Sequence, residues 1–215
     1  MKIGIIGAGF IARAVTAVAM KSGHEVMVSN SRGPDTLFSL TGTTGCKAGT
    51  PAEAATFGDL VVIAIPLKAY QAIPVTELVG KIVLDANNYY PVRDGHIVEL
   101  DRDRLTSSEL LAQHLPKSRI VKAFNAIVAA DIEKDGRPAG AADRRALPIA
   151  GDDQTAKRIV SELFEEIGFD VVDAGPLKEG YRFQPDTPAY CVTLDEVGLR
   201  EALSSTQPGT SKTSR

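Results

Sequence analysis

Runs of apolar, mostly β-branched residues recur along the chain and are bounded by glycine, proline or polar residues. The strongest run covers residues 60–65, and another opens the chain at residues 2–7. Because successive positions are apolar, rather than every second one, these runs are typical of parallel strands buried on both faces. We expect about eight strands, among them residues 2–7, 25–29, 60–65, 81–84, 119–123, 147–151 and 169–172.

Between these runs the apolar positions change to the spacing of amphipathic helices. Residues 10–21 show this spacing, and Gly23 is placed to end that helix. Thr50 and Pro51 are a typical N-cap and first helical residue. In residues 153–168 one apolar stripe is formed by Ala156, Ile159, Val160, Leu163, Phe164 and Ile167. The expected helices are residues 10–21, a short segment ending at about Leu40, 51–57, 68–78, 107–114, 153–168 and 194–203.

Strands that alternate with helices predict an α/β fold: a Rossmann-type, doubly wound and mainly parallel sheet with right-handed crossovers. The length suits a single NAD(P)-binding domain at residues 1–203. Within it we expect a nucleotide-binding core at residues 1–125, and C-terminal strands and helices at residues 126–203 that form a short extension. Residues 204–215 are rich in Ser, Thr, Pro and Gly and are expected to be a disordered tail.

Charge and composition exclude several classes of protein. The formal net charge is −3, so the chain lacks the basic balance of a nucleic acid-binding protein. The longest apolar run, residues 60–66, is far shorter than the roughly 20 residues of a membrane span, and a structured motif begins where a signal peptide would lie. Cys46 and Cys191 form no C-x-x-C pair, and the histidines lack metal-ligand spacing. We therefore expect a cytoplasmic protein without membrane, nucleic acid or metal partners. The small, charged residues 136–145 are expected to form an exposed loop.

The first expected strand runs into a glycine-rich turn, Gly7-Ala8-Gly9-Phe10-Ile11-Ala12, which matches G-x-G-x-x-(G/A). Gly7 permits a tight turn, and Gly9 has no Cβ, so backbone can approach a pyrophosphate. The helix that follows offers free N–H groups and the positive end of its dipole to phosphates. A strand before the motif, and a helix and a strand after it, favour dinucleotide binding over a glycine turn without a ligand.

The end of the second strand indicates which dinucleotide is bound. An NAD site places Asp or Glu about 20 residues past the glycines, where it binds the ribose hydroxyls. This chain has Asn30-Ser31-Arg32 instead, so no carboxylate repels a 2′-phosphate. Ser31 can donate a hydrogen bond, and Arg32 offers a planar cationic fork. These residues favour NADP(H); the alternative is that Arg32 is an ordinary solvated residue.

Five stretches, in this order along the chain, span most of residues 1–177. They are Gly7-Ala-Gly-Phe-Ile-Ala12, Asn30-Ser-Arg-Gly33, Ile63-Ala-Ile-Pro66, Val121-Lys-Ala-Phe-Asn125, and Gly151-Asp-Asp153 with its helix and Asp173-Ala-Gly-Pro-Leu177. Together they resemble the family of NADP oxidoreductases that act on the deazaflavin coenzyme F420. The same type of domain forms the cytoplasmic NADPH-binding part of metalloreductases of the six-transmembrane epithelial antigen of prostate family. The first stretch is generic, whereas the last two are more specific.

The resemblance implies that the dinucleotide lies along the carboxyl ends of the strands. The glycine turn would bind the pyrophosphate, and the residues after the second strand would bind the 2′-phosphate. The segment that ends in Pro66 would lie along the nicotinamide half. The expected cofactor-binding residues are Gly7, Ala8, Gly9, Phe10, Ile11, Asn30, Ser31, Arg32, Ala64, Ile65, Pro66 and Asn87.

The resemblance also implies an acceptor pocket between the loops that follow strands 81–84 and 119–123. The candidate acceptor-site residues are Asn88, Phe124 and Asn125. The polar connection 86–103 is longer than most, and it brings Tyr89 and Tyr90, which could stack on a planar ring together with Phe124. The alternative is that the asparagines satisfy turn backbone, as asparagine often does.

Two departures from the family concern the acceptor and not the nucleotide. Archaeal deazaflavin reductases carry histidine where this chain has Asn125 and proline where it has Val128. Residues 182–190 replace a longer helical ending. Both differences lie at or near the expected acceptor site.

Hydride transfer between two ring cofactors mainly requires that the protein stack them, because the chemistry belongs to the cofactors. We therefore expect an enzyme, an NADP(H)-dependent oxidoreductase whose acceptor is coenzyme F420, a flavin or another small molecule. A homodimer is expected, since only about forty residues follow the last strand to complete a site. Two alternatives stay open: a module that senses NADP(H) without turnover, and a reductase of a small imine or keto acid. The lack of a long helical C-terminal region argues against the second.

Overall fold

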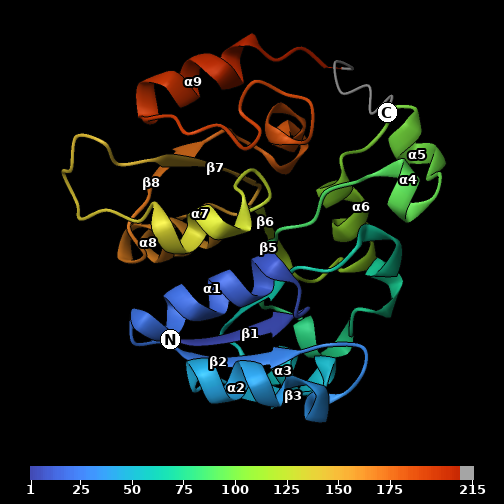
Figure 1. The fold of residues 1–215 in the computed structure, drawn as a ribbon. Helices are drawn as coiled ribbons and strands as arrows, with labels where there is room; N and C mark the ends of the chain where they lie inside the picture. Colours follow the sequence, from blue (N-terminus) through green and yellow to red (C-terminus); the bar gives the residue numbers. More distant parts are fainter. Residues whose placement is uncertain (209–215) are drawn as a thin grey trace.

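A computed structural model describes residues 1–208 of the chain. One eight-stranded sheet, in the order β3-β2-β1-β4-β5-β6-β7-β8, runs through the molecule (Figure 1). All neighbours pair in parallel except β6 and β7, which are antiparallel. The predicted α/β, Rossmann-type and mainly parallel fold is therefore confirmed. The strands are β1 (Lys2–Ile6), β2 (Glu25–Ser29), β3 (Lys47–Gly49), β4 (Leu60–Ile63), β5 (Ile82–Asp85), β6 (Arg119–Lys122), β7 (Ala146–Gly151) and β8 (Asp170–Asp173).

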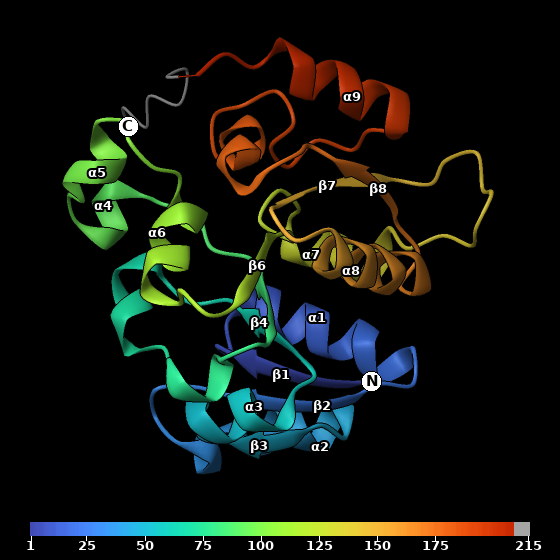
Figure 2. The ribbon, with the colours of Figure 1, turned by 180° about the vertical axis from the view of Figure 1, so that it is seen from behind.

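Helices cover both faces of the sheet, which explains why the strands are apolar at successive positions. The first face is packed against α1 (Phe10–Lys21), α2 (Phe38–Thr44), α7 (Ala129–Lys134) and α8 (Gln154–Glu166). The second face is packed against α3 (Pro51–Phe57), α6 (Ser107–His114), α9 (Glu196–Ser205) and 3-10 segments. The sheet twists so strongly that α1, α7 and α8 lie between β1 and β7 in both views (Figures 1 and 2).

The helix expected at residues 68–78 is wrong. The segment forms two 3-10 helices instead, η2 (Leu67–Ala72) and η3 (Thr76–Leu78). Pro74 lies between them and disfavours helical backbone at the residue before it, so Ile73 is extended, with φ −70° and ψ 130°. The chain therefore cannot continue as one helix.

The expected exposed loop at residues 136–145 is wrong at its carboxyl end. Arg144 and Arg145 are only 3% and 1% exposed. The Arg145 guanidinium lies 3.2 Å from Asp131 on α7 and 2.9 Å from Asp135, the C-cap residue of that helix. These carboxylates compensate for the desolvation of the cation. Charged residues that suggested an exposed loop are therefore buried here as ion-pair partners.

Two further segments differ from the expectation. The connection 86–103 contains two single-turn helices, α4 (Pro91–Asp94) and α5 (Val98–Asp101). Helix α9 continues through Ser205, and Thr206 is 4% exposed, so the predicted disordered tail starts too early. The rest of that prediction, from residue 209 onward, lies outside the described residues.

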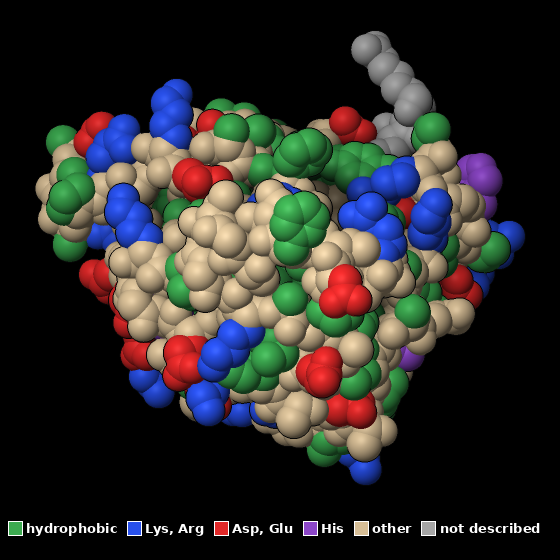
Figure 3. All heavy atoms as spheres, turned by 60° about the horizontal axis from the view of Figure 1, so that its bottom comes forward, with side chains coloured by type: hydrophobic (Ala, Val, Ile, Leu, Met, Phe, Trp, Pro, Cys, Tyr) green, Lys and Arg blue, Asp and Glu red, His purple; other side chains and the backbone are tan. Residues whose placement is uncertain are grey.

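The surface carries charges of both signs. On the face in Figure 3, Lys and Arg side chains and Asp and Glu side chains are both scattered between uncharged areas. No helix within residues 1–208 is long and apolar enough to cross a membrane. The expected cytoplasmic location remains a prediction.

Candidate functional site

The glycine turn between β1 and α1 is shaped by one close backbone approach. Gly7 has a φ of +125°, and a Cβ on this residue would lie 2.1 Å from the carbonyl oxygen of Ala64, at the end of β4. A side chain is therefore excluded at Gly7 for structural reasons. A Cβ on Gly9 would meet nothing within 4 Å, so the space beside Gly9 is open.

The first turn of α1 presents unsatisfied backbone N–H groups. Gly9 is the N-cap residue and supplies no side-chain cap, and the first turn contains no acidic residue. Phe10, the first helical residue, is 86% exposed. An uncapped N-terminus of a twelve-residue helix is a favourable place for an anion.

A pocket of about 250 Å³ lies beside this turn, between the ends of β1, β2 and β4. It is mostly apolar, as expected for a site that receives a flat ring rather than an ion. Its lining residues are Ile6, Gly7, Ala8, Gly9, Asn30, Ser31, Pro51, Ala64, Ile65, Pro66, Ala69, Ala72 and Ile73.

The loop after β2 is held by Asn30 and leaves its cation free. The Asn30 Oδ1 atom accepts a hydrogen bond from the Arg32 N–H at 2.9 Å, and its Nδ2 donates to Thr36 Oγ1 at 2.8 Å. Ser31 and Arg32 are exposed. No hydrogen bond or ion pair occupies the Arg32 guanidinium within residues 1–208. Asn30 therefore shapes the loop, while Ser31 and Arg32 remain available to a ligand.

A second pocket, of about 320 Å³, continues the first along the carboxyl edge of the sheet. Gly9, Ala64, Ile65 and Pro66 line both pockets, so the two form one cleft. The second pocket is lined by Gly9, Phe10, Ile11, Ala64, Ile65, Pro66, Ala86, Asn87, Asn88, Tyr90, Arg93, Phe124, Asn125, Ile127 and Tyr190. The structure thus brings together the predicted residues of the glycine turn and those that follow β4, β5 and β6.

The three predicted asparagines form the floor of the second pocket. Asn87 Oδ1 accepts from the Ile65 N–H at 3.0 Å. Asn125 Nδ2 donates to Asn88 Oδ1 at 3.1 Å and to the carbonyl of Phe183 at 2.9 Å. These contacts fit the alternative of a structural role. However, Asn87 Nδ2 and Asn125 Oδ1 are buried and have no partner within residues 1–208, so each amide keeps one unused polar atom.

Two predicted stacking residues use their aromatic side chains in contacts within the protein. Phe124 has a φ of +59° and is 2% exposed, and its ring packs on Phe164 with centroids 4.3 Å apart. The Tyr89 hydroxyl donates to Asp101 at 2.6 Å and accepts from the Ile97 N–H at 3.0 Å. Phe124 lines the second pocket, but both rings pack within the protein or bond to their own loop. The expectation that these aromatics stack on a ligand stays a prediction.

Three side chains that line the second pocket, Tyr90, Arg93 and Tyr190, make contacts with one another that the sequence did not predict. Tyr90 and Tyr190 are 100 residues apart, yet their hydroxyl oxygens lie 2.5 Å from each other. The Arg93 guanidinium lies 4.8 Å from the centre of the Tyr90 ring and donates to the carbonyl of Asn88 at 2.8 Å. Burial, together with the hydrogen bond to Tyr90, raises the pKa of Tyr190. Only the repeated tyrosines near the loops were a sequence signal.

A buried ammonium group lies beneath the pocket. Lys122 is fully buried, and its Nζ atom donates to the carbonyl of Asn87 at 3.2 Å and to Ser107 and Ser108 at 3.1 and 3.2 Å. Ser108 Oγ donates in turn to Asp85 Oδ2 at 2.6 Å. Burial lowers the pKa of Lys122, and the negative charge of Asp85 opposes that shift. The network fixes the loop that carries Asn87.

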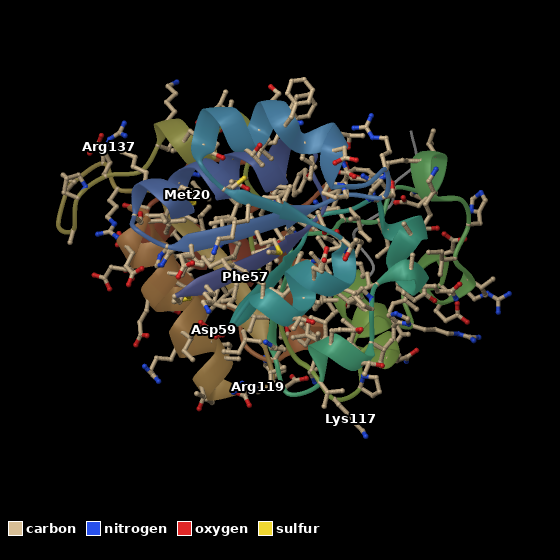
Figure 4. The ribbon with its side chains drawn as sticks, turned by 90° about the horizontal axis from the view of Figure 1, so that it is seen from below. Met20, Phe57, Asp59, Lys117, Arg119 and Arg137 are labelled. Atoms are coloured by element: carbon tan, nitrogen blue, oxygen red, sulfur yellow. The ribbon has the colours of Figure 1, made fainter. Side chains whose placement is uncertain are left out.

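A wider groove lies elsewhere. It measures about 720 Å³ and runs between the carboxyl ends of α1 and α8 and the loop that carries Arg137. Figure 4 shows Arg137 and Met20 on this side of the molecule, with Asp59 and Arg119 at the amino ends of β4 and β6. Two of its charged side chains already have partners, Asp143 for Arg137 and His24 for Glu166. Because open α/β sheets bind ligands at the carboxyl edge, we place the candidate site in the cleft and not in this groove.

No group of His, Cys, Asp and Glu side chains within the described part of the chain is arranged to hold a metal ion. The acceptor site must therefore be argued from hydrogen-bonding and aromatic groups.

Comparisons with known proteins agree with the geometry of the nucleotide half. The profile of the family described as NADP oxidoreductase, coenzyme F420-dependent, matches residues 2–89. The metalloreductase STEAP3 of Rattus norvegicus is 31% identical over 178 residues, which are 82% of this chain and 34% of that protein. The chain thus spans about a third of the length of this curated relative.

Two solved structures resemble the chain over nearly its whole length. The hypothetical protein SMa0349 from Sinorhizobium meliloti is 32% identical, with a TM-score of 0.77 over 90% of this chain and 95% of that one. A protein from Arthrobacter sp. FB24, regarded as an F420-dependent NADP-reductase, is 26% identical, with a TM-score of 0.72 over 84% and 87% of the two chains.

The Lys122 network predicts a large and specific loss of stability. Lys122→Met should lower the free energy of unfolding by about 3–5 kcal/mol, because it leaves the buried Asp85 carboxylate without its compensating cation. The double variant Lys122→Met/Asp85→Asn should be more stable than Lys122→Met alone. Urea unfolding followed by circular dichroism measures both. Strictly additive losses from the two single substitutions would contradict the coupling.

Proposed function

Because the chain belongs to the family of NADP oxidoreductases that depend on coenzyme F420, we propose that it is an NADP(H)-dependent enzyme that reduces a planar acceptor in the second pocket. The observation that carries this proposal is the continuous cleft from the loop of Ser31 and Arg32, past Gly9, to Asn87 and Asn125. One long ligand with two ends of different chemistry fits such a cleft.

The residues present fit NADP(H) along this cleft. The open space beside Gly9 and the uncapped start of α1 suit the pyrophosphate. Ser31 and the exposed Arg32 suit the 2′-phosphate, which favours a bidentate cation. The buried Nδ2 of Asn87 and Oδ1 of Asn125, a donor and an acceptor that have no partner among residues 1–208, suit the carboxamide of the nicotinamide.

When bound, NADPH supplies a hydride to the acceptor. The protein's own residues then orient and shield the reacting rings. Ile65 and Pro66 border both pockets and provide an apolar wall, while Asn88 and Tyr190 close the opposite side. Water exclusion by these groups protects the transfer from side reactions. We propose coenzyme F420 or a flavin as the acceptor, because a planar ring with several polar edges matches this lining.

The test is to follow NADPH absorbance in the presence of an acceptor panel: a deazaflavin, riboflavin and FMN, quinones and a cyclic imine. We expect oxidation of NADPH with at least one deazaflavin or flavin, and little with the imine. Tight binding of NADPH without turnover by any acceptor would instead favour the sensor module. Turnover with the imine alone would favour an imine reductase.

Arg32 should determine the choice of nucleotide. Arg32→Ala removes a charge-assisted hydrogen bond and should weaken NADPH by roughly 10- to 150-fold, equivalent to about 1.5–3 kcal/mol. NADH, which has no 2′-phosphate, should be almost unaffected. Isothermal calorimetry with both nucleotides measures the difference. Arg158→Ala on α8, where the arginine pairs with Glu162, is the matched control. Equal weakening of both nucleotides by Arg32→Ala would show that Arg32 is not the selective group.

The two glycines of the turn should respond differently to substitution. Gly9→Val places its branch in open space, so the protein should stay folded while NADPH binding is lost. Gly7→Ala should destabilise the fold itself, since its methyl group would collide with the Ala64 carbonyl at a positive φ. Thermal unfolding and NADPH calorimetry on both variants separate the effects. A folded Gly9→Val protein that still binds NADPH normally would place the nucleotide elsewhere.

A further inference from the structure

The second pocket is lined by two tyrosines whose hydroxyl groups contact each other. Tyr90 follows β5, whereas Tyr190 lies in the segment between η4 (Leu177–Phe183) and α9. Both line the second pocket, and their hydroxyl oxygens are 2.5 Å apart, a short hydrogen bond for two neutral phenols. Two elements that are distant in the sequence thus meet in a single O–H···O contact beside the cleft.

Counting hydrogens shows that one proton of the pair is available. Two neutral phenols carry two hydroxyl hydrogens, and their mutual bond uses one. Asn88 Nδ2, at 3.5 Å from the Tyr190 hydroxyl, is a donor and so cannot accept the other. The thiol of Cys191 is the remaining neighbour, and it is only a weak acceptor. A ligand heteroatom in the pocket would therefore be the better acceptor for the second hydrogen.

One end of the phenol pair lies next to solvent and the other is half-buried. On the side of Tyr90, the Arg93 guanidinium lies over the ring and is itself paired with Asp94. On the side of Tyr190, Cys191 is half-buried, and burial raises the pKa of its thiol. The Arg93 side chain is 42% exposed, so the Tyr90 end of the pair lies next to solvent. A proton lost from the pair can thus be replaced from that end.

We propose that Tyr90 and Tyr190 act together as the proton donor of the reaction, an inference that rests on the proposed function. The acceptor gains a hydride from NADPH at one ring atom, and the electron pair of its conjugated double bond moves to a ring nitrogen or carbonyl oxygen. That heteroatom takes the free phenol proton and becomes N–H or O–H. The resulting phenolate regains a proton from water through the other phenol. NADPH is oxidised, the acceptor is reduced by two electrons, and one proton is consumed.

The inference narrows the class of acceptor. A proton donor is useful only for an oxidant that takes up a hydride and a proton at separate atoms of one conjugated system, as flavins, deazaflavins and quinones do. An electron acceptor that takes up no proton, such as a bare metal ion, needs no such group. The phenol pair therefore favours an organic ring acceptor in this pocket.

Tyr90→Phe and Tyr190→Phe should each slow reduction of whichever ring acceptor the wild type uses by about 100-fold, within the usual range for general acids. NADPH affinity, measured by calorimetry, should change less than twofold. Tyr70→Phe is the matched control, since Tyr70 lies on η2, is not among the residues that line the second pocket, and its hydroxyl accepts from Gln71 Nε2. A control variant as slow as the other two would overturn the proposal.

A second measurement does not depend on turnover. The chain has five tyrosines and no tryptophan, so absorbance near 295 nm reports tyrosinate directly. Burial raises the pKa of both Tyr89 and Tyr190, so two tyrosines should ionise late in the protein without nucleotide, and Tyr190→Phe should remove only one of these two steps. A Tyr190→Phe titration that keeps both late steps would overturn the pair.

Replacement of all tyrosines by 3-fluorotyrosine keeps the shape of the protein and makes each phenol more acidic. Because the donor must be protonated, the loss of activity at alkaline pH should then begin at lower pH than in the unlabelled protein. An unchanged pH profile, or wild-type rates in both phenylalanine variants, would overturn the proton donor while the proposed reductase stands. Failure of the wild type to oxidise NADPH with any acceptor would overturn both.

Discussion

The cleft depends on one buried cation. The Lys122 ammonium group, at the end of β6, donates to the carbonyl of Asn87, and the Asn87 side chain accepts from the Ile65 N–H after β4. This chain of hydrogen bonds joins the loops after three neighbouring strands into a single floor. A buried ammonium group is costly unless it is compensated, so Asp85 and two serines of α6 had to be placed beside it. The position of the second pocket thus follows from the buried polar network around Lys122, and not from the loops alone.

The two ends of the cleft are built in different ways. The nucleotide end is made chiefly of backbone: a glycine at positive φ, an open helix N-terminus and a short loop that carries Arg32. The acceptor end is made of side chains from separate parts of the chain, joined where Asn88 bonds Asn125 and where Tyr90 meets Tyr190. A site made of backbone places little constraint on the side chains around it. A site made of side chains from separate parts of the chain requires each of those residues to be present.

This difference decides how much could be predicted. The glycine turn, an exposed Arg32 after the second strand and the parallel sheet follow from local patterns, and the structure places them as the patterns indicate. The contact of the Phe124 ring with Phe164 could not be predicted, because the sequence does not encode the positive φ of Phe124 locally. The helix at residues 68–78 failed at Pro74, whose effect on the preceding residue outweighed the apolar spacing. The segment 182–190 was expected near the acceptor site, but the contact of Tyr190 with Tyr90 could not be predicted, since only the folded sheet brings the two together.

The family profile covers the nucleotide end of the cleft but only part of the other end. It matches residues 2–89, which include the glycine turn, Arg32 and the strand ends that line the nucleotide half. Tyr90, Asn125 and Tyr190 all lie beyond it. Family membership therefore bears on the nucleotide, while the acceptor has to be inferred from groups that the profile does not describe. Those groups provide hydrogen bonds and a phenol proton but no arranged metal ligands within the described residues. In our proposal the chain keeps the nucleotide chemistry of its family, while its acceptor depends on contacts between distant residues, Asn88 with Asn125 and Tyr90 with Tyr190.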